Sequence, residues 1–160
     1  MKQELYPARP ALRLHRAIWG WVSAMGPGKS VAILGLNRFH REASLELSPR
    51  QLGSVRVVDV HGRLDHAQAK AFEAALAPHL ADCSKGGTPL VLDFSRVVYI
   101  SSVGLRALLL AAKQVKAQQG QIVVAALTPI VTEVFQVSHF NLVLQVFPDV
   151  AAAVAHVAPD

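Results

Sequence analysis

The sequence has one cysteine, few aromatic residues and no long apolar run. The single Cys83 excludes an internal disulfide, which fits a reducing cytoplasmic compartment. No uninterrupted apolar stretch approaches the roughly 18 residues that cross a bilayer, so we expect no membrane span. Aromatic residues make up 6% of the 160 residues and hydrophobic residues 52%. We therefore expect one ordinary domain with a core of Val, Leu and Ala.

The excess of positive charge lies in one part of the chain. Residues 1–50 contain eight Lys or Arg and three Glu, which accounts for the whole formal charge of +5. Residues 51–160 contain eight basic and eight acidic residues, so their formal charge is zero. The folded domain is therefore not expected to contact nucleic acid directly.

The apolar pattern divides the chain near residue 43. Residues 1–42 show no sustained periodicity and contain Pro7, Pro10 and Pro27, which predicts a poorly ordered basic N-terminal arm. Residues 43–160 alternate apolar stretches with regularly spaced Gly and Pro, which predicts the folded domain.

The folded part alternates strand-like and helix-like patterns. Strands are expected at 43–47, 55–60, 90–94, 122–126 and 142–147, and helices at 66–80, 102–119, 129–135 and 148–157. Asp65 is expected to cap the first helix, with Gln68 as its partner in a capping box. This order predicts an α/β fold, in which about four helices pack against a mixed sheet of four to five strands.

Two further patterns suggest chemistry, but neither supports it. The segment GPGKS at 26–30 ends like a phosphate-binding loop, yet Ser23 stands where the first glycine is needed and Pro27 lacks a backbone donor. The seven histidines have no spacing typical of a metal site, and no serine or cysteine lies in a nucleophile elbow. We expect no metal, no cofactor and no enzymatic activity.

The most informative pattern is a buried strand that leads into two serines at the start of a helix. Ser101 or Ser102 can cap this helix, and apolar residues then recur at helical spacing. At about 100° per residue, Arg106, Leu110 and Lys113 share the side that faces away from the core. A leucine between two cations is typical of a contact surface, so we expect these three residues to bind a partner.

Phosphorylation of Ser102 fits this position. A phosphate adds about −1.5 to −2 charges at pH 7, which a helix N-terminus tolerates and which Arg106, one turn later, can pair. A partner docked on the same face has to bury the anion, at a cost of about 4 kcal/mol, or roughly a thousandfold in affinity. One covalent event can therefore end an association while the fold survives.

Three segments together resemble the STAS-domain family and, within it, the anti-sigma factor antagonists. They are GRLD at 62–65, VLDFS at 91–95 and ISSVGLR at 100–106, and the strand GQIVV at 120–124 follows them. The likeness covers about residues 43–157. It implies a STAS-like fold and a protein-binding module.

The resemblance implies a partner-switching cycle. The unphosphorylated antagonist binds an anti-sigma factor that is also a serine kinase, phosphorylation ends the complex, and a metal-dependent phosphatase resets it. The family's register places the phosphoacceptor at Ser102. Many members carry an aspartate just before the acceptor, whereas this chain has Ser101 there, so Ser101 is the alternative phosphoacceptor. The resemblance also implies that Asp65, Asp93 and Gly104 support the phosphosite.

A second interpretation stays open at this point. The same domain can serve as a STAS subunit of a membrane lipid-transport ABC complex, in which the helix face docks permanently and no kinase acts. Phosphorylation distinguishes the two interpretations, because only the antagonist is a kinase substrate.

Overall fold

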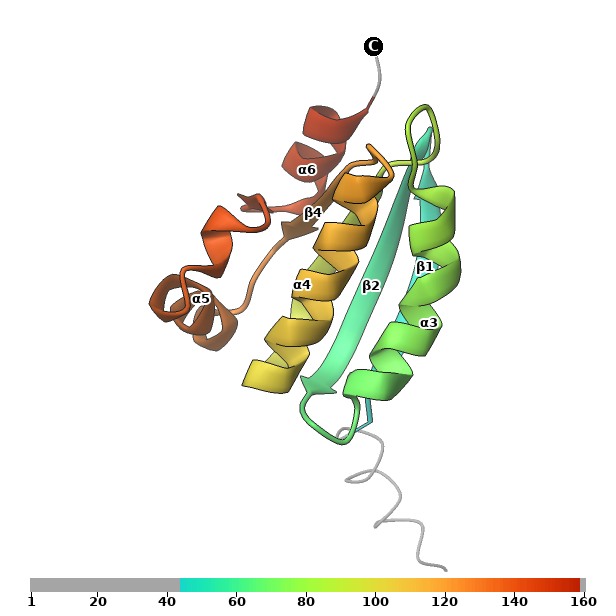
Figure 1. The fold of residues 1–160 in the computed structure, drawn as a ribbon. Helices are drawn as coiled ribbons and strands as arrows, with labels where there is room; N and C mark the ends of the chain where they lie inside the picture. Colours follow the sequence, from blue (N-terminus) through green and yellow to red (C-terminus); the bar gives the residue numbers. More distant parts are fainter. Residues whose placement is uncertain (1–43, 159–160) are drawn as a thin grey trace, which may run out of the picture. The chain divides into compact units, whose positions relative to one another are not determined.

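Five strands form one sheet in the order β1-β2-β3-β4-β5 (Figure 1). The computed structural model describes residues 44–158, so the arm predicted at 1–42 lies outside the described residues. The strands are β1 (Glu46–Leu52), β2 (Val55–Leu64), β3 (Leu90–Ile100), β4 (Ile122–Ala125) and β5 (Val146–Phe147). β1 is antiparallel to β2, and the other neighbours pair in parallel, so the sheet is mixed as predicted.

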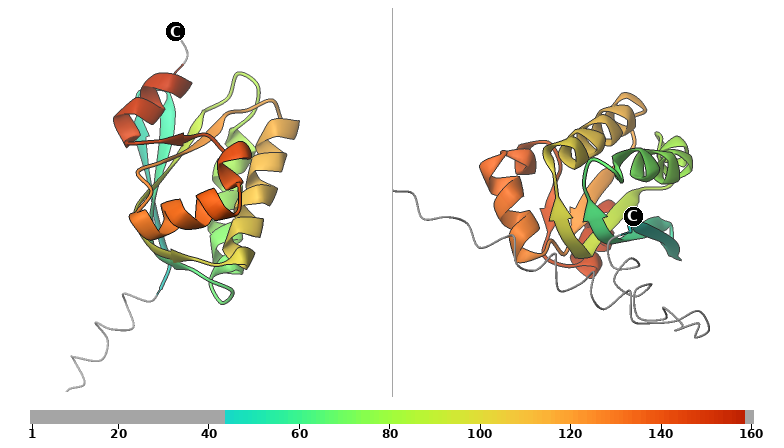
Figure 2. Two further views of the ribbon diagram at one scale, coloured as in Figure 1. Left: turned by 90° about the vertical axis from the view of Figure 1, so that its left-hand side faces the viewer. Right: turned by 90° about the horizontal axis from the view of Figure 1, so that it is seen from below.

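Helices cover both faces of this sheet. They are α3 (Ala69–Asp82), α4 (Ser102–Ala117), α5 (Pro129–Val137), the short 3-10 helix η1 (Phe140–Leu142) and α6 (Val150–Val157). α3, α4 and α5 share one hydrophobic cluster with the sheet, whereas α6 packs on a second cluster. Figure 2 shows α6 on the side of the sheet opposite α3 and α4. The predicted α/β fold class and the order of its elements are confirmed.

The parallel strands are buried on both faces where helices cover them. Val57 and Val58 are both fully buried, as are Val91 and Leu92, because neighbouring side chains enter the two opposite clusters. No polar or charged residue is buried among the described residues. Polar chemistry is therefore confined to the ends and the surface of the sheet.

Two strands are longer than predicted. β2 passes residue 60 because Gly62 adopts φ +107°, a conformation that glycine accepts readily, and the strand continues to Leu64. A side chain at Gly62 would collide with the backbone carbonyl of Ser44. β3 continues to Ile100 with two shifts of register against β2. Both strands therefore end level with each other, at the start of α4.

The outer elements also differ from their predicted bounds. β1 begins at Glu46 rather than residue 43. It contains Pro49, which has no backbone N–H, and an edge strand tolerates proline because one side of the strand needs no hydrogen-bond donor. The strand predicted at 142–147 is mostly a helical turn. The backbone N–H of Leu144 donates to the carbonyl of Phe140 at 3.1 Å, which leaves only two residues for β5.

A cluster of three side chains joins the start of β2 to the end of α3. Arg56 Nη1 lies 2.9 Å from Asp82 Oδ2 and donates to His79 Nδ1 at 3.3 Å. Burial lowers the pKa of His79 below its usual 6.5, and the Arg56 guanidinium lowers it further, while Asp82 opposes both. The neutral ring is therefore the form that fits the folded chain.

We expect acid to weaken the fold through His79. A folded-state pKa below the unfolded value gives a contribution to stability that is present above about pH 6.5 and is lost as the pH falls through the folded-state pKa. The free energy of unfolding is measured with urea at about pH 7.5 and about pH 5.5. It should fall less between these two pH values for His79→Gln than for the native chain. The exposed His66→Gln is the control. An equal acid loss in His79→Gln would show that the cluster has no such role.

Candidate functional site

The ends of β2 and β3 bring the two serines to the start of α4. Leu64 pairs with Ile100 in the last register position, and the backbone N–H of Ser101 donates to the carbonyl of Leu64 at 3.0 Å. The Ser101 hydroxyl donates to the same carbonyl at 3.3 Å and accepts the N–H of Gly104 at 3.2 Å. Ser101 is therefore the N-cap of α4, and its hydroxyl is used in both directions.

Ser102 occupies a different environment from Ser101. It is the first residue of α4 and is exposed, whereas Ser101 is half-buried. Ser102 therefore lies at the positive end of α4, a helix of sixteen residues, where the first backbone N–H groups have no helical partner. The sequence left the capping role open between the two serines, and the structure assigns that role to Ser101.

Gly104 lets α4 approach the sheet closely. A Cβ at this position would lie 2.5 Å from the carbonyl oxygen of Leu64, 2.7 Å from its Cγ and 3.1 Å from Cγ1 of Ile100. These distances are too short for any side chain. Gly104 is buried, so it supports the serines by packing and by its N–H, and it does not meet solvent.

Asp65 lies at the same end of the sheet as the serines, directly after Leu64. The predicted capping box is confirmed in part, because Asp65 Oδ1 accepts the N–H of Gln68 at 3.2 Å, the contact that the first residue of such a box makes. This contact closes a turn that precedes the helix, since α3 itself begins at Ala69 and Gln68, at its N-cap, makes no side-chain cap. The helix starts later because the four residues from Asp65 form this separate turn.

Arg63 contacts both Asp65 and Tyr99, and the sequence did not predict this cluster. The Arg63 guanidinium lies 4.3 Å from the centre of the Tyr99 ring, and its Nε lies 3.7 Å from Asp65 Oδ2. Arg63 pairs with Tyr99 across β2 and β3. A register prediction for these two strands could have found the pair, but the bulges in β3 hide that register from the sequence.

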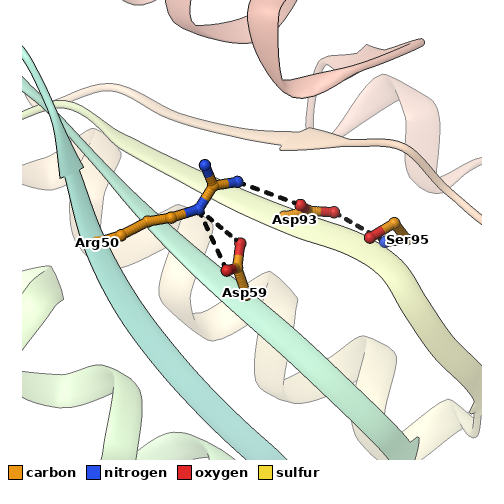
Figure 3. Close-up of polar contacts among 4 residues, drawn as sticks. All are labelled: Arg50, Asp59, Asp93 and Ser95. Atoms are coloured by element: carbon orange, nitrogen blue, oxygen red, sulfur yellow. Dashed lines mark hydrogen bonds and ion pairs between the residues drawn. The ribbon is translucent and has the colours of Figure 1, made fainter.

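Asp93 lies elsewhere, in the first half of β3 (Figure 3). Its carboxylate accepts the backbone N–H of Ser95 at 2.9 Å and lies 3.5 Å from Nη2 of Arg50, whose Nε donates to Asp59 at 3.0 Å. Six residues of strand lie between Asp93 and Ile100, and the seven steps span roughly 23 Å at the usual rise. The structure therefore does not bring Asp93 to the serines, and Asp93 instead helps Arg50 to join three strands.

The outward face of α4 has the composition that its sequence predicts. Arg106 and Lys113 are exposed, and 48% of Leu110 is accessible to solvent. The opposite face is buried through Gly104, Ala107, Leu108, Ala111, Ala112 and Val115. The three predicted contact residues thus lie on one exposed surface of α4, which begins one turn beyond Ser102.

A metal site, a membrane span and a phosphate-binding loop are the other features that bear on function. Within residues 44–158, His, Cys, Asp and Glu nowhere gather in a group of three that could hold a metal ion. In the same part of the chain, no helix combines the length and the apolar character that a membrane crossing requires. The segment at 26–30 lies outside the described residues.

Comparisons with known proteins identify a family and a relative. A family model described as the STAS domain matches residues 46–153. A Bordetella bronchiseptica protein named as an anti-sigma factor antagonist, BtrV, is 39% identical over 104 residues, which cover 65% of this chain and 84% of that protein.

Solved structures share the fold. An anti-sigma factor antagonist from Mycobacterium paratuberculosis superposes with a TM-score of 0.64 at 25% identity, covering 71% of this chain and 94% of that one. The Bacillus cell-fate determinant SpoIIAA in its phosphorylated form gives a TM-score of 0.53 at 19% identity, covering 72% and 100%. From the family match and the BtrV match together, this chain belongs to the STAS-domain family.

Proposed function

We propose that this chain is an anti-sigma factor antagonist that sequesters an anti-sigma factor with serine-kinase activity and releases it when Ser102 is phosphorylated. The observation that carries the proposal is the exposed Ser102 at the start of α4, beside a cationic and apolar face. The similarity to BtrV supports the same role. The chain is then a cytoplasmic binding module, and ATP belongs to the kinase.

The environment of the two serines favours Ser102 as the phosphoacceptor. A phosphate on Ser101 would replace the hydroxyl that donates to Leu64 and would place its oxygens against that carbonyl. A phosphate on Ser102 enters solvent at the positive end of α4. Ser102 is accessible to a kinase, and its phosphorylation leaves the Ser101 cap in place, so both arguments favour Ser102.

The phosphate acts on the complex and leaves the fold intact. At the first helical position it adds charge where the helix dipole is favourable, and Arg106 stands one turn away for pairing. A partner that covers Arg106, Leu110 and Lys113 borders Ser102 and has to desolvate the new anion. SpoIIAA, which shares the fold, is known in an unphosphorylated and a phosphorylated form. A metal-dependent phosphatase completes the cycle by restoring the hydroxyl.

The supporting residues take separate roles in this proposal. Gly104 sets the position of the helix start, and Asp65 fixes the turn beside it. We assign Asp93 no role at the phosphosite, because its carboxylate contacts Arg50 and Ser95.

Mass spectrometry tests the modification. Incubation with ATP and candidate anti-sigma factor kinases from the same genome should add about 80 Da to the native chain. Ser102→Ala should abolish the gain, and Ser101→Ala, which costs about 1 kcal/mol of stability through the lost cap, should retain it. A gain that persists in Ser102→Ala and is lost in Ser101→Ala would transfer the role to Ser101.

The lipid-transport interpretation is not favoured. BtrV and the Mycobacterium paratuberculosis protein, each matched over most of its length, are named as anti-sigma factor antagonists. Stable copurification with membranes, together with no mass gain, would reverse this order.

A further inference from the structure

The guanidinium of Arg63 is held in place without a hydrogen bond. Its central carbon lies 4.3 Å from the centre of the Tyr99 ring, which supports it from below. Its Nε lies 3.7 Å from Asp65 Oδ2, which is longer than the about 2.7–2.9 Å of a charge-assisted hydrogen bond. Within residues 44–158 no group accepts a hydrogen bond from this guanidinium, and 42% of the side chain is accessible to solvent. Its N–H donors are therefore free to bind an incoming group.

The register of β2 and β3 places Arg63 on Tyr99 and leaves the pair open. Leu64 and Ile100, the next pair along, enter the core under α4, so Arg63 and Tyr99 point to the other side of the sheet. The register shift between Gly62 and Arg63 re-aims the arginine there. On that side α6 packs at the opposite end of the sheet, where β3 and β4 begin (Figure 1). No helix of the described chain therefore covers the Arg63–Tyr99 pair.

The pair lies at the same end of the sheet as Ser102. Tyr99 precedes Ser102 by three residues, and Arg63 is followed directly by Leu64, whose carbonyl accepts the backbone N–H of Ser101. The start of α4 thus has a cation on either side of it, with Arg63 across the sheet and Arg106 on the helix. A partner that docks over this end of the sheet can contact both.

We propose that Arg63, seated on Tyr99, binds a carboxylate of the anti-sigma factor and so selects partners with an acidic side chain at that point. The inference rests on the proposed function and adds a contact that determines partner specificity. A planar guanidinium matches a carboxylate in a bidentate pair, and the ring beneath it lowers the entropy lost on binding because the side chain is already ordered. A monoanion fits better than a dianion, because Asp65 already places one negative charge nearby.

The same contact rejects wrong partners. A basic side chain opposite Arg63 would hold two cations together in a contact that excludes water, and like charges in an interface are strongly unfavourable. Arg106 and Lys113 give the outward face of α4 the same sign. The cations on the two sides of Ser102 therefore favour one kind of partner, an anti-sigma factor with an acidic docking surface.

Isothermal titration calorimetry of the full chain with candidate anti-sigma factor kinases from the same genome tests the contact. Arg63→Ala should raise Kd roughly thirtyfold. Arg63→Lys, which keeps the charge and loses the planar fork, should raise Kd roughly tenfold. Arg63→Glu should raise it by several hundredfold, since two carboxylates then face each other. All three variants should melt within about 3 °C of the native chain, because the side chain lies at the surface.

Tyr99 is a positioning residue in this proposal, and its own variants test that role. Tyr99→Leu removes the platform and leaves the charge, so Kd should rise roughly fivefold. The double variant with Arg63→Ala should bind no more weakly than Arg63→Ala alone, because the ring acts through the arginine. Tyr99→Phe keeps the ring and should bind like the native chain. Additive losses in the double variant would show that Tyr99 does not act through Arg63.

Arg96→Ala is the matched control, because Arg96 is an exposed arginine of the same strand pair. Its Kd should stay within about twofold of the native value. An equal loss in Arg96→Ala and Arg63→Ala would show that the partner responds to net charge, which overturns the proposal. An unchanged Kd in Arg63→Ala also overturns it.

These results separate the contact from the switch. If Arg63→Ala binds like the native chain while Ser102→Asp still weakens the complex, the proposed function stands and the contact fails. If Ser102→Asp binds like the native chain, the switch fails, and the Arg63 variants still decide the contact because they need only a complex. A native chain that binds none of the candidate kinases overturns both.

Discussion

Ser102→Asp should lose most of its affinity for the anti-sigma factor kinase and keep its melting temperature. The aspartate places one fixed charge at the start of α4, where the helix dipole makes it neutral to stabilising by about 0.3–1 kcal/mol. In the complex the same charge lies beside Arg106 and Leu110 and has to be desolvated. We expect Kd to rise roughly a hundredfold, less than for a phosphate because the charge is smaller. Isothermal titration calorimetry with the purified kinase measures the change.

Ser102→Asn separates charge from size in this experiment. Asparagine has nearly the same shape as aspartate and is also accepted at helix starts, but it carries no charge. Its affinity should stay within about threefold of the native value. Equal losses in Ser102→Asn and Ser102→Asp would show that steric contact at the helix start, and not the anion, ends the complex.

Gly104→Ala should destabilise the domain by about 2–3 kcal/mol, although the same change in an ordinary helix is favourable by about 1 kcal/mol. The new Cβ would lie 2.5 Å from the Leu64 carbonyl oxygen, which also accepts the N–H of Ser101. Relief of the contact requires α4 to move away and that hydrogen bond to stretch. Thermal unfolding should show a melting temperature lower by roughly 10 °C.

Gly53→Ala is the control for this prediction. Gly53 has φ +61°, and a Cβ there would meet nothing within 4 Å. The same added methyl group therefore costs only the backbone strain of about 1 kcal/mol. If Gly104→Ala is as stable as the native chain, α4 is not held against Leu64 as tightly as the structure places it.

The start of α4 could be predicted because its determinants are local. The serines, the following apolar spacing and the exposed Arg106, Leu110 and Lys113 all lie within one segment, and helical periodicity alone gives their faces. The alternation of strands and helices likewise predicts the layered fold. The sequence could not choose between Ser101 and Ser102 as the cap, because that choice depends on where the Leu64 carbonyl lies.

Features that depend on contacts between distant segments could not be predicted from the sequence. The position of Asp93 depends on the length of β3, and β3 continues past its bulges to Ile100. The Arg63–Tyr99 contact depends on the register that those bulges create. The later start of α3 depends on the turn that Asp65 closes. In each case pairing between separate strands, or competition between two local hydrogen bonds, decides the outcome.

The most direct test compares the chain with and without phosphate on Ser102. The kinase affinity and the free energy of unfolding are measured on the same two preparations. We expect Kd to rise roughly a thousandfold, or about 4 kcal/mol, while the free energy of unfolding changes by no more than about 1 kcal/mol. Equal affinities for the two forms, or a phosphorylated chain that no longer folds, would contradict it.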